Sequence, residues 1–313
     1  LSDIIGKRMK LTRAGREYKG CCPFHKEKTP SFTVNDVKGF YHCFGCGAHG
    51  DSIGFLMNHD NMSFMDAVEQ LAGLAGMQVP KSSPEDEKKY KQQASLYDLM
   101  EAVASYYERQ LNQPENKKIL QYLKERGISS EIMRGFRIGF ASADEQSLKQ
   151  ALLKAGFKVA DLIASGLFKN STKNQNDIYP FFRGRIMFPV QDFQGRVVAF
   201  GGRVLPERYG GPAGKDAPKY INSPETDIFH KGRMLYGLSR ARKAIGDGEP
   251  VIVVEGYMDV IALAQAGFKA AVAPLGTALT EAQIEMLWKV MPEDMRAPIL
   301  CFDGDAAGQR AAA

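Results

Sequence analysis

The chain has 313 residues, of which 44% are apolar and 25% are charged, as in an ordinary globular protein of two domains or slightly more. No stretch approaches the roughly 20 apolar residues that a membrane span requires, and no signal peptide is recognisable. The five cysteines make no sensible disulfide framework, so we expect a cytoplasmic protein without a membrane partner.

The net charge of +5 is concentrated in one segment. From Lys169 to Lys243 the chain has 14 lysines and arginines and six acidic residues, which gives +8 and leaves −3 for the rest. Eight of the fourteen are arginines, whose planar guanidinium groups can bind a phosphate with two parallel hydrogen bonds. Solvated surface cations would give the same count, but the surplus favours a polyanion such as nucleic acid.

The first 80 residues contain two short chelating pairs, C-x2-H and C-x2-C, separated by seventeen residues. Such pairs can deliver four ligands to the corners of a tetrahedron around zinc, with no position left for water. The sequence therefore predicts a structural rather than a catalytic zinc ion, and we interpret Cys21 and His42 as neighbours that are not ligands. The predicted ligands are Cys22, His25, Cys43 and Cys46.

Aromatic and basic residues surround these ligands, and short strands expected at 31–34 and 39–42 would present them together. Rings can stack on unpaired bases while cations hold phosphates, so we expect at least one ring to contact nucleic acid. Other rings would cover the small metal-stapled core. The rings are Phe32, Phe40, Tyr41 and Phe44, and the cations are Arg16, Lys19, Lys26, Lys28 and Lys38.

Farther along, apolar periodicity predicts helices at 51–57 and 63–72, and then at 96–111 and 118–126, with Gly127 as the stop signal. The charged, apolar-poor stretch from 80 to 93 is interpreted as a linker. Strands are expected at 185–190 and 196–200, as a hairpin around Gly195, and a loop at 206–218. The pair Gly201-Gly202 offers a weak indication that backbone approaches a phosphate.

The last part alternates strands and helices. Strands are expected at 251–254, 270–273 and 298–302, and helices at 259–267 and 281–291. A β-α-β-α-β order implies a parallel sheet with right-handed crossovers.

Acidic residues follow two of these strands directly. Glu255 comes after the first strand, and Asp303 and Asp305 come after the third. Because parallel strands end at the same edge of a sheet, we expect the three carboxylates to converge and to bind Mg²⁺ or Mn²⁺. Asp259, one helical turn beyond Glu255, is a further candidate ligand. The alternative is that acids follow these strands only because loops are polar.

These motifs resemble a known family. Segments 255–259 and 303–308 resemble the toprim motifs shared by bacterial primases, topoisomerases and related nucleases. Segments 22–32 and 43–47 resemble the zinc ribbon of bacterial primases, and segments 219–226 and 229–232 are similar to basic motifs of the same family. The three blocks in this order identify the chain as a member of the DnaG-type DNA primases.

The resemblance implies a zinc domain that reads a single-stranded DNA template and a polymerase domain that makes a short RNA primer from ribonucleoside triphosphates. It implies catalytic roles for the acids named above, and a helicase partner bound through a C-terminal domain that this chain lacks. It also implies a bacterial, nucleoid-associated protein. The residues it assigns to nucleic acid or nucleotide phosphates are Arg126, Arg203, Lys219 and Lys231.

The expected fold class is α/β and α+β, multidomain: a zinc ribbon at 1–80, a linker at 81–93, a mixed basic subdomain at 94–245 and a partial toprim parallel sheet at 246–313. The chain begins at Leu1 and stops in mid-pattern, so we expect a fragment with a truncated toprim sheet. Two alternatives are a toprim topoisomerase or nuclease, and a zinc-ribbon nucleic-acid binder without activity.

Overall fold

The computed structural model describes the chain apart from residues 61, 63, 78–83, 172–176, 212–216, 277–278, 293–294, 305–307 and 309–313. The chain forms two compact units, Leu1–Pro84 (the N-terminal unit) and Glu85–Ala313 (the C-terminal unit). They divide inside the segment that the sequence analysis interpreted as a linker. Among the described residues, no helix combines the length and the apolar character needed to cross a membrane.

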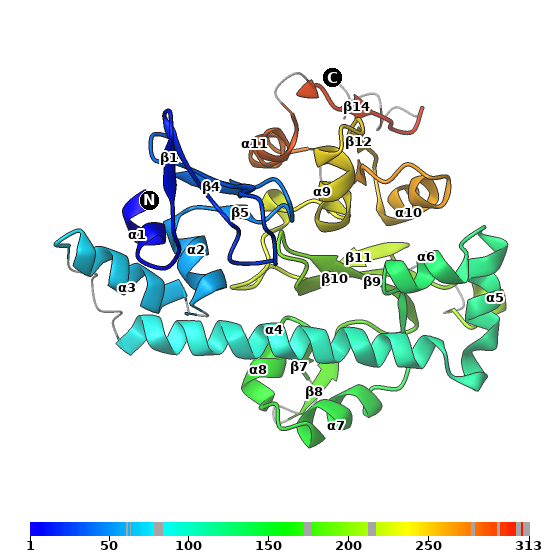
Figure 1. Cartoon of the computed structure of the whole chain (residues 1–313). Helices are drawn as coiled ribbons and strands as arrows, with labels where there is room; N and C mark the ends of the chain where they lie inside the picture. Colours follow the sequence, from blue (N-terminus) through cyan, green and yellow to red (C-terminus); the bar gives the residue numbers. More distant parts are fainter. Residues whose placement is uncertain are drawn as a thin grey trace. The chain divides into compact units, whose positions relative to one another are not determined.

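The N-terminal unit is a five-stranded antiparallel sheet whose strands follow one another in chain order (Figure 1). Phe32 and Tyr41 are fully buried and stack with their ring centroids 5.1 Å apart, and Phe55 packs edge-on against Tyr41 at 5.5 Å. The strands expected at 31–34 and 39–42 are confirmed as β3 and β4. The elements are α1 Ser2–Gly6, β1 Thr12–Ala14, β2 Glu17–Gly20, β3 Phe32–Asn35, β4 Phe40–Cys43, β5 His49–Gly50, α2 Ser52–His59 and α3 Phe64–Leu74.

The C-terminal unit begins with a long helix, α4 (Pro84–Leu111). The sequence analysis expected no helix before residue 96, and this boundary was wrong. The prediction rested on the lack of apolar residues and did not consider helix propensity. Glu85 and Glu87 precede Lys89 and Lys91 by four residues, a spacing that favours a solvated helix. Pro84 occupies the first helical position, where its missing N–H group is not needed.

An antiparallel sheet in the order β11-β10-β9-β6 forms the centre of this unit, and Figure 1 shows α4 running along it. Tyr107 of α4 packs edge-on against Phe200 of the sheet at 5.4 Å. The expected hairpin is confirmed, with Gly195 at φ +86° in its turn. The elements are η1 Pro114–Asn116, α5 Lys117–Glu125, α6 Ser130–Gly135, β6 Gly139–Ala141, α7 Ser147–Lys154, α8 Val159–Ala164, β7 Phe168–Asn170, β8 Ile178–Pro180, β9 Arg185–Gln191, β10 Val197–Val204, η2 Glu207–Tyr209, β11 Tyr220–Asn222 and η3 Lys231–Arg233. Part of the loop expected at 206–218 lies outside the described residues.

The expected parallel sheet is also confirmed. Its order is β13-β12-β14, and Ile252 pairs with both Ala271 and Ile299 in parallel register. Glu255 follows the central strand by two residues and Asp303 follows a neighbouring strand by three, so both come after the same edge of the sheet. The elements are α9 Leu238–Gly246, β12 Ile252–Val253, α10 Tyr257–Gln265, β13 Ala271–Val272, α11 Glu281–Val290 and β14 Ile299–Leu300.

Candidate metal and nucleic-acid sites

The four predicted zinc ligands come together in the N-terminal unit. The ligand atoms of Cys22, His25, Cys43 and Cys46 all lie within 4.8 Å of one another. Cys22 Sγ is 3.7 Å from Cys46 Sγ, and Cys43 Sγ is 3.8 Å from His25 Nδ1. Two sulfur ligands at about 2.3 Å from a tetrahedral zinc ion are separated by about 3.8 Å, so the cluster fits this ion.

The surroundings of the cluster also fit a metal site. Glu27 lies 3.2 Å from His25 Nε2, the nitrogen that faces away from the cluster, and accepts a hydrogen bond of 2.5 Å from the Cys22 N–H group. A carboxylate in this place fixes the orientation of a metal-binding histidine. A Cβ atom at Gly45 would lie 2.8 Å from His25 Nε2, so only glycine leaves room for the ring. The sequence analysis missed Glu27.

The pKa of the Cys43 thiol is consistent with a metal site. Burial by itself would raise the pKa of Cys43, but hydrogen bonds with Ser31 and with the backbone N–H groups of Cys46 and Gly45 outweigh it and lower the pKa to about 6. Burial and the neighbouring thiols of Cys43 and Cys46 raise the pKa of Cys22 to about 12, so the low pKa of Cys43 makes it the thiolate of this pair. A metal ion binds the deprotonated form of both cysteines.

One face of the N-terminal sheet points away from the aromatic core. A row of paired residues crosses all five strands on this face, from Thr12 through Lys19, Thr33 and His42 to His49. The row follows from strand alternation, because Val34 and Tyr41, one position along, are fully buried on the other face.

Exposed rings gather at the β5 end of this row. Phe44 is 75% exposed and Phe40 is 39% exposed, whereas Phe32 is fully buried. The ring of His42 lies 4.5 Å from Phe44 and 6.1 Å from His49. The structure thus separates the rings that the sequence grouped: Phe32 and Tyr41 belong to the core, and Phe40 and Phe44 are available to a ligand. His42 was interpreted from the sequence only as a neighbour of the zinc ligands and His49 was not singled out, although the alternation Phe40-x-His42-x-Phe44 marks one strand face.

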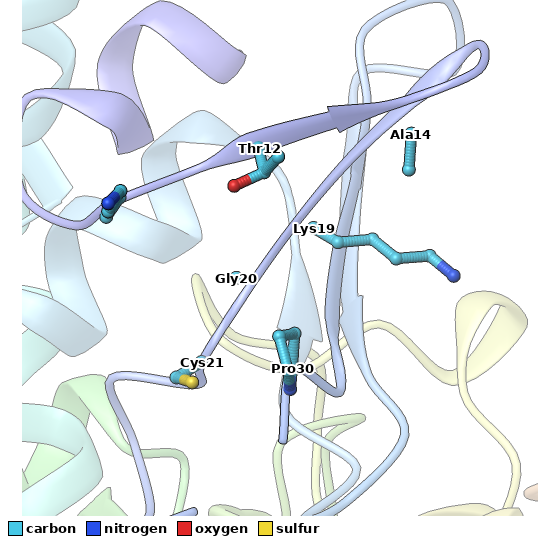
Figure 2. A pocket seen from close by; sticks show the side chains of 7 residues that line it. Thr12, Ala14, Lys19, Gly20, Cys21 and Pro30 are labelled. Atoms are coloured by element: carbon cyan, nitrogen blue, oxygen red, sulfur yellow. The ribbon is translucent and has the colours of Figure 1, made fainter. Parts of the chain in front are cut away.

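A pocket of about 570 Å³ lies at the other end of the row. Figure 2 shows Thr12 and Lys19 on the β1–β2 hairpin and Cys21 and Pro30 at its base. Lys10 also lines the pocket, and no acidic residue does. The outward face therefore has a basic end and an aromatic end, two features that suit a single-stranded nucleic acid.

In the C-terminal unit, the acidic residues meet at the edge of the parallel sheet. The Asp303 N–H group donates a hydrogen bond of 2.8 Å to Glu255 Oε1, which brings the ends of β12 and β14 together. Gly308 closes over them, because a Cβ atom there would lie 2.8 Å from Glu255 Oε1. Asp305 lies outside the described residues.

Asp259 is close to the same edge. Its Oδ2 atom accepts a hydrogen bond of 3.0 Å from the Gly256 N–H group, so it also holds the turn after Glu255. Partial burial raises the pKa of Asp259; the charge of Asp303 raises it further, while the Gly256 N–H group and Arg126 oppose the rise. Mutual repulsion of carboxylates is what a divalent cation relieves, so the acids fit such an ion. The charge of Arg126 therefore acts on Asp259.

Arg203 is placed differently from the expectation. It is only 8% exposed, and its Nε donates a hydrogen bond of 3.1 Å to the Tyr122 hydroxyl group. Its Nη1 donates to the hydroxyl group of Tyr220, the cross-strand partner of Arg203 on β11. Its guanidinium group is thus held inside the protein by two tyrosines that the sequence analysis did not single out.

The two lysines lie on the surface of the same unit. Lys219 is exposed and has its Nζ 6.0 Å from the centre of the Tyr220 ring. The backbone of Lys231 is fixed by Glu225, which accepts from its N–H group at 3.2 Å, and by Gln283, which donates to its carbonyl oxygen at 2.9 Å.

The glycines before Arg203 have a packing role. A Cβ atom at Gly201 would lie 2.2 Å from Cζ of Tyr257, and one at Gly202 would lie 2.7 Å from Cδ1 of Phe182. Both positions are filled by rings rather than open to a phosphate. Tyr257 also donates a hydrogen bond of 2.6 Å to Asn222 Oδ1, so it joins the acidic edge to β11.

Comparisons with known proteins match three successive parts of the chain to three family models. Residues 1–87 match the family model of the CHC2 zinc finger, residues 106–242 match that of the DNA primase catalytic core, N-terminal domain, and residues 249–313 match that of the Toprim domain. The DNA primase of Pseudomonas putida is 47% identical over 313 residues, which cover 99% of this chain and 46% of that protein.

Solved structures show the same similarity. The zinc-binding and RNA polymerase domains of the Aquifex aeolicus primase are 32% identical with a TM-score of 0.61, covering 99% of this chain and 71% of that one. The DnaG primase catalytic domain bound to single-stranded DNA is 42% identical with a TM-score of 0.61, covering 71% and 65%.

The chain belongs to the DnaG-type DNA primase family. It spans about half the length of the curated DNA primases that it matches. Membership of this family supports zinc at the cysteine–histidine cluster and a divalent metal ion at the acidic edge of the parallel sheet.

Proposed function

We propose that this chain forms the template-binding and polymerising parts of a DNA-dependent RNA primase, which makes short RNA primers on single-stranded DNA by metal-dependent nucleotidyl transfer. The observation that carries the proposal is the meeting of Glu255, Asp303 and Asp259 at one edge of the parallel sheet. Family membership supplies the reaction class that these groups suit.

We assign the domains in the order that the sequence suggested: a zinc ribbon at 1–80, a linker at 81–93, a basic subdomain at 94–245 and the toprim part at 246–313. From Pro84 on, the linker segment belongs to helix α4. The replicative helicase is a further proposed partner, and we place the protein in the bacterial cytoplasm.

In the proposed template site, Phe40 and Phe44 stack on bases while Lys10 and Lys19 neutralise phosphates at the opposite end of the sheet face. The zinc ligands act only through the fold, because they hold the turns on either side of this face. The catalytic domain of a relative is bound to single-stranded DNA in its solved structure, which supports the class of ligand but not its place on this sheet face.

In the proposed catalytic site, Glu255, Asp303 and Asp305 would hold Mg²⁺ or Mn²⁺, with Asp259 as the fourth acid. When bound, such ions lower the pKa of a primer 3′-hydroxyl group and neutralise the incoming triphosphate. Glu255 contributes its carboxylate from a turn fixed by Asp259. Arg126, Arg203, Lys219 and Lys231 are the residues proposed for nucleotide or nucleic-acid phosphates, with Arg203 acting from its buried position.

The arrangement gives no support to a topoisomerase. Tyr257 is the tyrosine next to the acidic turn, and it is 6% exposed with its hydroxyl group bound to Asn222. Burial raises its pKa well above the ordinary value, which makes it a poor nucleophile.

The test is incorporation of labelled ribonucleotides on single-stranded DNA with Mg²⁺ or Mn²⁺, comparing this chain with a longer form of the protein. Glu255→Gln keeps the size of the side chain and removes its charge, so metal affinity and primer synthesis should fall together. Glu285→Gln, an exposed position on α11, serves as the matched control. Wild-type synthesis by the Glu255→Gln protein at limiting metal would refute the mechanism.

A further inference from the structure

Arg185, the first residue of β9, is a buried cation with no acidic partner in the described part of the chain. It is 7% exposed, and among the described residues it forms no ion pair. Burying a charge in this way costs free energy and lowers the pKa of its guanidinium group. The side chain therefore needs a structural or functional reason to remain an arginine.

The hydrogen bonds of Arg185 indicate that reason. Its Nη1 atom donates to the carbonyl oxygen of Gly202 at 3.2 Å and to that of Pro218 at 2.9 Å. The side chain passes close to Gly202, where an added Cβ atom would lie 3.1 Å from Arg185 Cδ. An arginine on β9 thus reaches past β10 to hold the chain just before β11.

Lys219 follows Pro218 directly. The carbonyl oxygen of Lys219 accepts a hydrogen bond of 3.0 Å from the Val204 N–H group. The backbone of this exposed lysine is consequently fixed on both sides, by Arg185 before it and by Val204 after it. Arg185 itself has its Nη1 atom bound to two backbone carbonyl oxygens, so we assign it no phosphate contact of its own.

We propose that Arg185 is a positioning residue for phosphate binding by Lys219. The inference rests on the proposed function, because it takes the phosphates of template or nucleotide as the anions that Lys219 contacts. Without Arg185, the 217–219 segment loses its buried anchor, and the ammonium group of Lys219 must be ordered again at each binding event.

A double-mutant cycle tests this coupling. Binding of a fluorescein-labelled oligothymidylate is measured by anisotropy for the whole chain, for Arg185→Met, for Lys219→Ala and for the double variant. Arg185→Met should weaken binding roughly tenfold in the wild-type background, the order expected from hydrogen bonds to a charged group. It should have little further effect once Lys219 is alanine.

Arg242→Met is the matched control. Arg242 is exposed on α9 and donates to one carbonyl oxygen, that of Phe193, at 2.9 Å. Arg242→Met should show no energetic coupling with Lys219→Ala in oligothymidylate binding. Equal weakening by Arg185→Met in both backgrounds would overturn the proposal, because Arg185 would then act independently of Lys219.

Amide hydrogen exchange gives a second readout. Exchange at Lys219 and Tyr220 should accelerate in Arg185→Met, while exchange in α10 stays unchanged. If the methionine variant does not fold, Arg185→Lys takes its place, and unchanged exchange at Lys219 in that protein would contradict the proposal.

The two hypotheses can fail separately. If Lys219→Ala binds normally while Glu255→Gln abolishes primer synthesis, the inference fails and the proposed function stands. If no primer is made but Arg185 and Lys219 remain coupled in binding, the inference stands and the proposed function fails.

Discussion

The contact between Gly201 and Tyr257 makes a sharp prediction about how the acidic edge is held. Gly201 lies on β10, and Tyr257 is the first residue of α10, two positions after Glu255. A Cβ atom at residue 201 would lie 2.2 Å from the tyrosine ring, where ordinary contact begins at 3.4 Å. Gly201→Ala must therefore displace the ring by about 1.2 Å or move β10.

The size of the effect follows from what the ring contacts. Overpacking of this kind costs about 1–3 kcal/mol. A displaced ring also loses its hydroxyl bond to Asn222, a further loss of about 1 kcal/mol. For a folding unit of this size, about 2–4 °C is lost per kcal/mol, so the unfolding transition of the C-terminal unit should fall by roughly 5–15 °C.

Calorimetry of the whole chain measures this directly. Gly246→Ala is the matched control, because Gly246 also lies in the C-terminal unit and an added Cβ atom there would meet nothing within 4 Å. That variant should be neutral or slightly stabilising, as alanine favours a helix. In a Tyr257→Leu background, Gly201→Ala should cost much less, since the ring is gone. An unchanged transition in Gly201→Ala itself would show that the ring does not depend on this glycine.

Three further outcomes are expected. Cys43→Ala should lose bound zinc and unfold the N-terminal unit, since this small unit has little other core; full zinc by metal analysis would contradict this. Phe44→Ala should weaken single-stranded DNA binding by about 1–3 kcal/mol in a titration and leave the free energy of unfolding unchanged. Phe32→Ala should instead lower the free energy of unfolding by about 3–5 kcal/mol in chemical denaturation, because this ring is fully buried. Hydrogen bonds from Arg137 lower the pKa of Glu101 below its ordinary 4.5, so this stabilisation is present above that value and is lost as the pH falls through the lowered pKa. Glu101→Gln should flatten that acidic part of a Tm–pH profile, and an identical profile would argue against the linkage.

Features with a short-range signature could be predicted from the sequence. The zinc ligands were found because two chelating turns fix their own geometry, and the parallel sheet because strand and helix patterns alternate. The meeting of Glu255 with Asp303 followed from a topological rule, since both come at the same edge of one sheet.

Features that depend on packing could not be predicted in the same way. Phe32 and Phe44 are chemically alike and close in sequence, yet one is fully buried and the other is 75% exposed. Only strand register assigns them to opposite sides. The resemblance assigned Arg203 to phosphates, but nothing in the sequence shows that Tyr122, 81 residues earlier, accepts a hydrogen bond from it.

Packing also explains how the basic residues of one sheet and the acidic residues of another can contribute to one site. The basic residues Arg203 and Lys219 come from β10 and the start of β11, and the acidic residues come from a different sheet. Electrostatic attraction alone would not set their separation, because charges at a solvated edge are mobile and screened. Tyr257 provides a fixed link: its ring lies on Gly201 and stacks on Phe188 at 5.2 Å, and its hydroxyl group binds Asn222. The distance between the proposed metal site and the proposed phosphate site therefore depends in part on this buried ring, and we expect a change at the ring to alter that distance without removing a residue of either site.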